Sequence, residues 1–218
     1  MKDAILTISS KNYSSWSLRG WLLCRMAGLE FEEETLSSDD PSTRAELLLL
    51  SPSFLVPRLT HNGLKVWDTL ALAEYLNETF PKAGLLPHAP AARVHCRAIS
   101  GEMHQGFANL RSALPMNLKA NYPGFKIWAG AQSDIDRVIA VWRECLRTYD
   151  GPYLFGERPS MADAMYAPVA TRFKTYDVKL DRLSADYCET LLNLPDIIAW
   201  IEAAKAERVE VEELEAEF

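Results

Sequence analysis

The chain has 218 residues, of which 48% are hydrophobic and 24% are charged, and its formal net charge is -7. This composition supports a sizeable hydrophobic core in one large domain or two small ones. An acidic chain without a basic stripe argues against binding to nucleic acid or to an anionic membrane surface. No run approaches the ~18 apolar residues that a membrane-spanning helix needs.

The sequence carries no clear signal for a metal or a nucleotide. His61, His88 and His95 show no metal-ligand spacing with one another or with a cysteine, and there is no GxGxxG or Walker loop. The lone His104 is interpreted as a packed residue. The four cysteines are interpreted as reduced core residues; they are Cys24, Cys96, Cys145 and Cys188. The short, polar N-terminus is not typical of a secretory signal, so we expect a cytoplasmic protein.

The first 80 residues alternate between strand and helix patterns. Residues 4–8 are apolar and β-branched, which predicts a strand. Apolar residues from Leu18 to Met26 then recur at helical spacing, and Gly28 ends this helix. Further strands are expected at residues 31–36, 56–60 and 64–67, the last two joined by a turn at Asn62-Gly63, with helices at 41–50 and from Asp68 onward. This order predicts a small mixed sheet with helices on its faces.

The second part of the chain is expected to be helical. Residues 81–90 contain three prolines and predict a linker between an N-terminal domain at 1–80 and a C-terminal domain at 91–218. The expected helices are 91–118, 133–149, 160–175, 182–192 and 195–207. The final stretch, residues 207–218, carries six glutamates and is interpreted as a solvated tail.

Three serines crowd the start of the first helix, at Ser14, Ser15 and Ser17. One serine would suffice as an N-cap. Several hydroxyls beside the unpaired amides of a helix N-terminus suit an anion, and a hydroxyl there could lower the pKa of a bound thiol. Simple capping is the alternative interpretation, and no GxSxG elbow supports an acyl-transfer nucleophile.

Two further stretches of the N-terminal domain suit ligand binding. Pro57 begins a strand, where a proline cannot donate to the sheet, so a cis bond after Val56 would leave the backbone of Val56 to pair with a peptide-like ligand. Asp68 and Thr69 open a helix, where a hydroxyl and free amides suit a carboxylate and an acid suits an ammonium group. An ordinary N-cap is the alternative for this pair.

Ser160 and Asp163 have the spacing of a capping box, which we assign to structure in the helical domain.

The order of these features along the whole chain resembles the cytosolic glutathione transferase family. Residues 14–19, SSWSLR, are similar to the Ser-Ser-Cys-Ser-x-Arg motif of its zeta class, and more similar to bacterial zeta-like proteins with Tyr-Ser-Ser-Trp-Ser-Leu-Arg. Residues 110–117, LRSALPMN, also resemble that bacterial group, which is maleylacetoacetate isomerase-like. The sequence departs from the zeta motif at Trp16, where the motif has cysteine, and at Asp68-Thr69, where Glu-Ser or Gln-Ser is usual.

The resemblance implies a thioredoxin-like α/β N-terminal domain, an all-α C-terminal domain and a homodimer. It implies glutathione as co-substrate and no metal. Ser14 matches the serine that donates to the glutathione thiolate, with Ser15 or Tyr13 as possible substitutes. Val56 matches the residue whose backbone binds the cysteinyl part of glutathione, and Pro57 the cis-proline. Thr69 and Asp68 match the pair at the γ-glutamyl end, and Ser160 with Asp163 the family's folding box.

The resemblance favours an enzyme whose bound thiolate attacks a small electrophile between the two domains. The expected walls of that pocket are Tyr13, Trp16, Met103, Phe107, Arg111 and Met116. For the residues from Met103 onward, helical core packing or a dimer contact is the alternative. Arg111 would suit an acidic substrate, because its guanidinium fork matches a carboxylate. A glutathione-dependent cis–trans isomerase of the maleylacetoacetate type and a non-catalytic glutathione-binding protein of the same fold remain the alternatives.

Overall fold

A computed structural model of the chain describes residues 3–37, 40–43 and 56–208. Its N-terminal domain contains a four-stranded mixed sheet in the order β2-β1-β3-β4. The strands are β1 (Ala4–Ile8), β2 (Glu32–Thr35), β3 (Arg58–His61) and β4 (Leu64–Trp67). β1 pairs in parallel with β2 and antiparallel with β3, and β3 pairs antiparallel with β4. The predicted mixed sheet is therefore confirmed.

Burial follows position in the sheet. The central strand β1 is apolar and almost entirely buried, with Leu6 paired to the buried Leu59 of β3. The edge strand β2 is exposed along its length and has the charged sequence EEET, which is typical of an edge protected from further pairing. Asn62 and Gly63, both with positive φ, make the tight turn between β3 and β4 that their sequence predicts.

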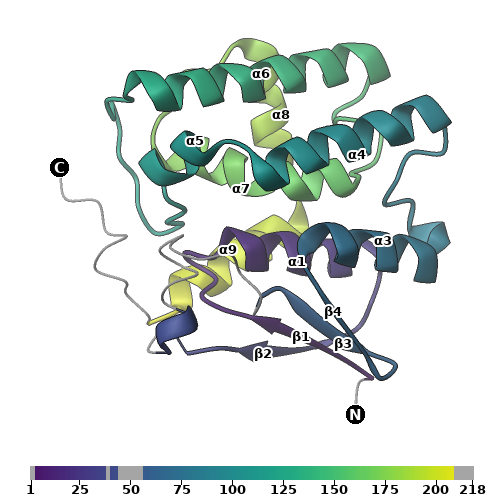
Figure 1. Ribbon diagram of the computed structural model, residues 1–218. Coiled ribbons are helices and arrows are strands. Elements are labelled where there is room, and N and C mark those ends of the chain that lie inside the picture. The colour runs from purple at the N-terminus through teal and green to yellow at the C-terminus, as the bar shows by residue number, and fades with distance from the viewer. Residues whose placement is uncertain (1–2, 38–39, 44–55, 209–218) are drawn as a thin grey trace.

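Two helices of the N-terminal domain, α1 (Ser15–Met26) and α3 (Thr69–Thr79), lie side by side between the sheet and the helical domain (Figure 1). This position explains why α1 has almost no polar face: it packs against β1 and α3 on one side and against α7 (Met161–Thr175) on the other. Gly28, with φ of +73°, follows the end of α1 as expected.

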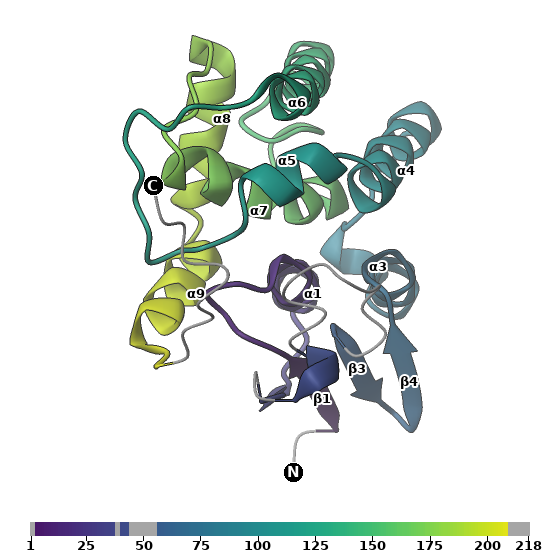
Figure 2. The ribbon, with the colours of Figure 1, turned by 60° about the vertical axis from the view of Figure 1, so that its left-hand side comes forward.

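The helical domain follows a short 3₁₀ turn, η1 (Pro81–Ala83). Its helices are α4 (Pro90–Gln105), α5 (Ala108–Ala113), α6 (Ala129–Tyr149), α7, α8 (Arg182–Leu192) and α9 (Pro195–Ala206). Helix α7 is buried on nearly all sides and is packed against α4, α8 and α1 (Figure 2). Helix α9 returns to the N-terminal domain and lies beside α1 in both views. None of the described helices is long and apolar enough to cross a bilayer.

The single helix expected over residues 91–118 is wrong. The chain forms α4 and the short α5 instead, separated by Gly106 and Phe107. Gly106 is extended, and a Cβ there would lie 2.7 Å from the carbonyl oxygen of Glu102. Phe107 has a φ of +59°, which a continuous right-handed helix excludes. The chain therefore bends between α4 and α5, although the apolar pattern of the sequence runs through both.

Two other expectations concern segments that lie partly outside the described residues. The helix expected at 41–50 falls mostly outside them, although residues 41–43 are helical. The solvated tail expected from residue 207 is wrong for Glu207, whose carboxylate is bonded to the N-terminal domain, and the rest of that stretch from residue 209 is outside the described residues.

The predicted capping box is confirmed at the start of α7. The Asp163 carboxylate accepts hydrogen bonds from the Ser160 amide at 2.7 Å and from its hydroxyl at 2.9 Å. Its other oxygen accepts from the Leu154 amide and the Tyr187 hydroxyl. All four donors converge on one buried carboxylate, which therefore joins three segments of the helical domain.

A close approach between α1 and the start of β3 depends on Gly20. The peptide bond between Val56 and Pro57 is cis, as the sequence suggested. The Pro57 ring lies against α1 at Gly20, where an added Cβ would be 2.3 Å from Pro57 Cβ and 2.5 Å from Pro57 Cγ. Only a residue without a side chain leaves the proline in this position.

Replacing Gly20 with alanine should therefore lower the free energy of unfolding by about 1–3 kcal/mol, because helix or proline must move. The matched control is Gly101→Ala in α4, where an added Cβ meets nothing within 4 Å. That variant should gain about 0.5–1 kcal/mol from helix propensity. Urea denaturation measures both, and equal effects of the two substitutions would refute the packing argument.

Candidate functional site

The candidate site lies where the turn between β1 and α1, the start of α3, and the helices α4, α5 and α7 meet. The turn holds Tyr13, Ser14 and Ser15, all buried. Polar side chains from both domains face one another across this junction, as the interdomain contacts below show.

Ser14 is the N-cap of α1. It has an extended backbone, and its hydroxyl accepts a hydrogen bond from the Ser17 amide at 3.2 Å. A hydroxyl that accepts one bond still carries its own proton, so capping is compatible with donation to a thiolate. The Ser15 hydroxyl forms no hydrogen bond within the described part of the chain. The Ser17 hydroxyl instead accepts a hydrogen bond from the Ser9 amide at 3.0 Å.

Asp68 and Thr69 stand at the start of α3, as predicted. One Asp68 oxygen caps the helix by accepting from the Leu70 and Ala71 amides, at 2.8 Å and 3.2 Å. Thr69 is only 1% exposed, and its hydroxyl has no hydrogen-bond partner among the described residues. A buried hydroxyl left without a partner costs about 1–3 kcal/mol. A helix N-terminus with an unpaired hydroxyl fits a carboxylate that supplies the missing acceptor.

His104 joins α4 to this helix start, although the sequence suggests only a packed residue. Its Nε2 lies 2.5 Å from the second oxygen of Asp68, and its ring lies 5.1 Å from the ring of Trp16. Burial disfavours the charge of Asp68, but the bond with His104 and the bonds from the Ala71 and Leu70 amides prevail and lower the pKa of this carboxyl. The contact holds the two domains together beside Thr69.

Trp16 occupies the centre of the junction. The Arg19 guanidinium lies 4.6 Å from the centre of its ring, and the Arg111 guanidinium lies 5.8 Å from it. Both distances are within the range of cation–π attraction. Since Trp16 also contacts His104, one aromatic ring connects α1, α4 and α5.

Three arginines gather behind Trp16 without acidic partners. Arg19, Arg111 and Arg172 form no salt bridge with any carboxylate in residues 3–37, 40–43 and 56–208. Arg19 donates through Nε to the Met165 carbonyl at 2.8 Å, but its buried Nη1 has no partner there. Arg172 donates to the carbonyls of Arg111 and Leu114, at 3.1 Å and 2.6 Å.

Burial lowers the pKa of all three groups, and repulsion between neighbouring cations adds to it for Arg19 and Arg172. Burial, followed by repulsion from Arg172 and Arg111, lowers the pKa of Arg19. Burial and repulsion from Arg111 lower the pKa of Arg172 to about 10. Burial also lowers the pKa of Arg111, although the charge of Asp134 opposes it. An anion bound here would relieve both the repulsion and the unpaired donor.

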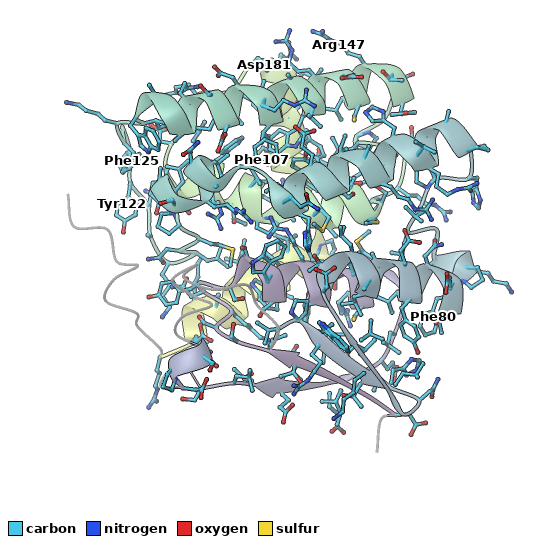
Figure 3. All side chains as sticks on the ribbon, viewed as in Figure 1. Phe80, Phe107, Tyr122, Phe125, Arg147 and Asp181 are labelled. Atoms are coloured by element: carbon cyan, nitrogen blue, oxygen red, sulfur yellow. The ribbon has the colours of Figure 1, made fainter. Side chains whose placement is uncertain are left out.

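The other expected wall residues lie in or beside the hydrophobic core. Met103 and Met116 are buried within it, as is Leu110. Phe107 stands at the junction of α4 and α5 and is 7% exposed (Figure 3). Core residues such as these can also contact a ligand at the junction. Arg111, the remaining wall residue, is half-buried.

Val56 is buried and precedes Pro57, whose ring lies against α1 at Gly20, just before β3. This places the cis bond in the same domain as Ser14 and Thr69. The described residues contain no group of three side chains able to hold a metal ion.

The sequence did not single out His104 or Arg172 as site residues. Both have partners far away in the chain, at Asp68 and at the carbonyls of residues 111 and 114. For Arg172 a weak signal exists, because it is a cation in the otherwise apolar run of α7, where burial without a function is costly.

Two family models match the chain. "Glutathione S-transferase, N-terminal domain" matches residues 13–79, and "Glutathione S-transferase, C-terminal domain" matches residues 104–203. A probable maleylacetoacetate isomerase of Caenorhabditis elegans is 26% identical over 192 residues, which are 85% of this chain and 86% of the relative.

Solved structures share the fold. A glutathione transferase homolog from Burkholderia gl BGR1, with bound glutathione, has a TM-score of 0.71 at 18% identity and covers 95% of this chain and 100% of its own. A maleylacetoacetate isomerase from Anaeromyxobacter dehalogenans 2CP-1, with glutathione in its active site, has a TM-score of 0.64 at 20% identity and covers 92% and 96%. At these identities the likeness establishes the fold.

Proposed function

Since the chain belongs to the glutathione S-transferase family, we propose that it binds glutathione at the start of α3 and β3 and activates the thiolate for attack on a small electrophile. The unpaired hydroxyl of Thr69 carries this proposal. It would donate to the γ-glutamyl carboxylate at the positive end of α3, beside the Leu70 and Ala71 amides that Asp68 caps. Val56, beside the cis-proline Pro57, would pair through its backbone with the cysteinyl part.

Ser14 would hold the thiolate. It lies at the positive end of α1, where an anion is favoured, and a hydroxyl there stabilises a thiolate over a thiol. Ser15 and Tyr13 are the neighbouring candidates on the same turn. In this arrangement Asp68 acts mainly as the cap of α3 and as the partner of His104, with one oxygen committed to each.

The electrophile would be acidic. Arg19 and Arg111 lie beside Trp16, Arg172 is close enough to repel both, and none of the three forms a salt bridge in the described parts of the chain, which favours a ligand with one or two carboxylates. The same observation supports an isomerase as a second candidate function. There the thiolate adds to a conjugated C=C bond, the resulting single bond rotates, and elimination returns both the trans product and the thiolate. Glutathione is consumed in conjugation but not in isomerisation.

The proposed enzyme is a cytoplasmic homodimer. Four buried cysteines without a disulfide agree with a reducing compartment. Leu64 and Trp67 on β4 and Val94 on α4 are exposed large apolar residues, and both elements lie on the same side of the molecule (Figure 2). Such residues are a natural contact for a second copy, in which each domain would meet the other domain of its partner.

Replacing Thr69 with valine should weaken glutathione binding by about tenfold or more, because one hydrogen bond to a carboxylate is lost. The free energy of unfolding of the unliganded protein should rise by about 1 kcal/mol, since the hydroxyl has no partner to lose. Calorimetric titration and urea denaturation measure the two effects.

The matched control is Thr171→Val, because the Thr171 hydroxyl donates to the Pro168 carbonyl at 2.8 Å. This variant should lose about 1 kcal/mol of stability and bind glutathione normally. If Thr69→Val destabilises the protein and leaves binding intact, the hydroxyl has a structural role instead.

Replacing Ser14 with alanine should raise the thiol pKa of bound glutathione by about one unit, through the loss of one bond to the thiolate. The measurement is an ultraviolet titration of the thiolate, with Ser15→Ala as the comparison. An effect on Ser15→Ala alone would move the role to Ser15. A wild type that binds glutathione without lowering its thiol pKa would be a binding protein and not an enzyme.

Replacing Arg111 with methionine should raise KM for an acidic electrophile by about tenfold or more, while a neutral aryl halide is turned over as before. Arg147→Met is the control, because Arg147 lies on the outer side of α6 (Figure 3). Steady-state kinetics with both substrates, together with the amount of glutathione consumed, also separates conjugation from isomerisation. Equal losses for both substrates would contradict an acid-binding role.

A further inference from the structure

The first residue after α9, Glu207, is bonded to the turn that carries the site serines. Its carboxylate accepts from the Ser10 hydroxyl at 2.6 Å, from the Lys11 amide at 3.0 Å and from the Asn12 amide at 3.0 Å. Successive backbone amides that point at one anion form a nest, which is a strong site for a carboxylate. Glu207 comes from 195 to 197 residues further along the chain, so this is a long-range contact between the two ends of the fold.

Together, Ser10 and Glu207 hold four consecutive amides of the turn. Glu207 accepts from residues 11 and 12. The Ser10 hydroxyl accepts from Asn12 at 3.1 Å and from Tyr13 at 3.2 Å, and the Ser10 carbonyl accepts from Ser14 at 3.0 Å. The chain of bonds therefore runs from the Glu207 carboxylate through Ser10 to the backbone of Ser14.

Glu207 is itself fixed from two sides. Its carbonyl accepts from the Lys119 ammonium group at 2.6 Å. About two turns before Glu207, Trp200 of α9 is buried and donates through its indole to the Lys11 carbonyl at 2.9 Å. The connection from β1 to α1 bends toward α9 in both ribbon views (Figures 1 and 2). The carboxylate thus arrives at the turn on a rigid helix and not on a free tail.

The Asn12 side chain adds a second attachment. It donates to the Asn117 side chain at 3.0 Å and accepts from the Leu118 and Lys119 amides, at 2.7 Å and 3.1 Å. Asn12 is fully buried. Since Lys119 also contacts Glu207, the turn, the segment after α5 and the end of α9 form one connected polar network.

We propose that Glu207 is a positioning residue, which sets the turn at residues 10–14 so that the Ser14 hydroxyl meets the glutathione sulfur. This role rests on the proposed function. Without the carboxylate, the Lys11 amide and the Ser10 hydroxyl lose their acceptor and the Asn12 amide loses one of its two acceptors, so the turn gains freedom where Ser14 caps α1. Glu207 does not touch the substrate and acts through Ser10.

The first test is amide hydrogen exchange of the unliganded full chain, followed by NMR. In Glu207→Ala, exchange of the Lys11 and Asn12 amides should become about tenfold faster or more, while the Leu6 amide in β1 keeps its rate. Glu207→Gln, which retains one acceptor oxygen, should give a smaller increase. Glu202→Gln removes the same charge from the exposed side of α9 and should change nothing. Unchanged exchange in Glu207→Ala overturns the proposal.

The second test connects the turn to the thiolate. In Glu207→Ala the thiol pKa of bound glutathione should shift upward, as in Ser14→Ala, and kcat should fall by about threefold to tenfold with a smaller change in KM. Combining Glu207→Ala with Ser10→Ala should give less than the sum of the two effects, because both act through one network. Faster exchange with an unchanged thiol pKa and kcat overturns the positioning role.

The proposed function and the positioning role of Glu207 would be overturned by different results. If the wild type does not bind glutathione, the proposed function is wrong, and the exchange experiment still reports whether Glu207 orders the turn. If the wild type binds glutathione with a lowered thiol pKa and the Glu207 variants retain it, the proposed function stands and only the role of Glu207 is lost.

Discussion

The burial of α1 between two different layers is the constraint on which the rest of the structure depends. One side of this helix must fit the sheet and the Pro57 ring, and the other must fit α7. Gly20 meets the first requirement by leaving room for the proline, and the buried Leu22, which shares a small cavity with Ala164 and Ala167 of α7, meets the second. Because the helix is fixed along its length, its N-terminus is fixed too. The serine turn is therefore presented at a rigid position, which a precise contact with a ligand requires.

The site residues share an energetic feature, since several are polar groups buried without a full set of partners. The Thr69 hydroxyl and one nitrogen of Arg19 are unpaired among the described residues, and the three arginines repel one another. A protein tolerates such groups at a cost of several kcal/mol in total when a ligand completes them. The contrast with Asp163 is informative, because that buried carboxylate has four donors within the protein and serves the fold.

Much of the fold follows from local sequence, but the site follows from it only in part. The strand at 4–8, the turn at Asn62-Gly63 and the helix at 182–192 are all governed by periodicity and turn chemistry, and they were predictable. The break at Phe107 was not, because a positive φ in a phenylalanine has no local sequence signal. The pairing of His104 with Asp68 and the contact of Glu207 with residues 10–12 are long-range, so only the folded chain shows them. The position of Thr69 at the start of a helix was predicted correctly. That its hydroxyl lacks a hydrogen-bond partner depends on the packing around it, which the sequence does not show.

The two anion-binding regions of the N-terminal domain differ in a way that bears on selectivity. At the serine turn, the amides of residues 11 and 12 face the internal carboxylate of Glu207, so this nest is already neutralised by the protein itself. At the start of α3 the Asp68 carboxylate caps the Leu70 and Ala71 amides, but the Thr69 hydroxyl and Nη1 of Arg19 have no hydrogen-bond partner in the described residues. In the proposed function, an incoming carboxylate would be attracted to Thr69 and the arginines and not to the nest, where it would meet the charge of Glu207. In our proposals the Glu207 carboxylate orders the turn, whereas the donors of Thr69 and Arg19 bind the ligand, so one acidic residue after α9 separates the two roles.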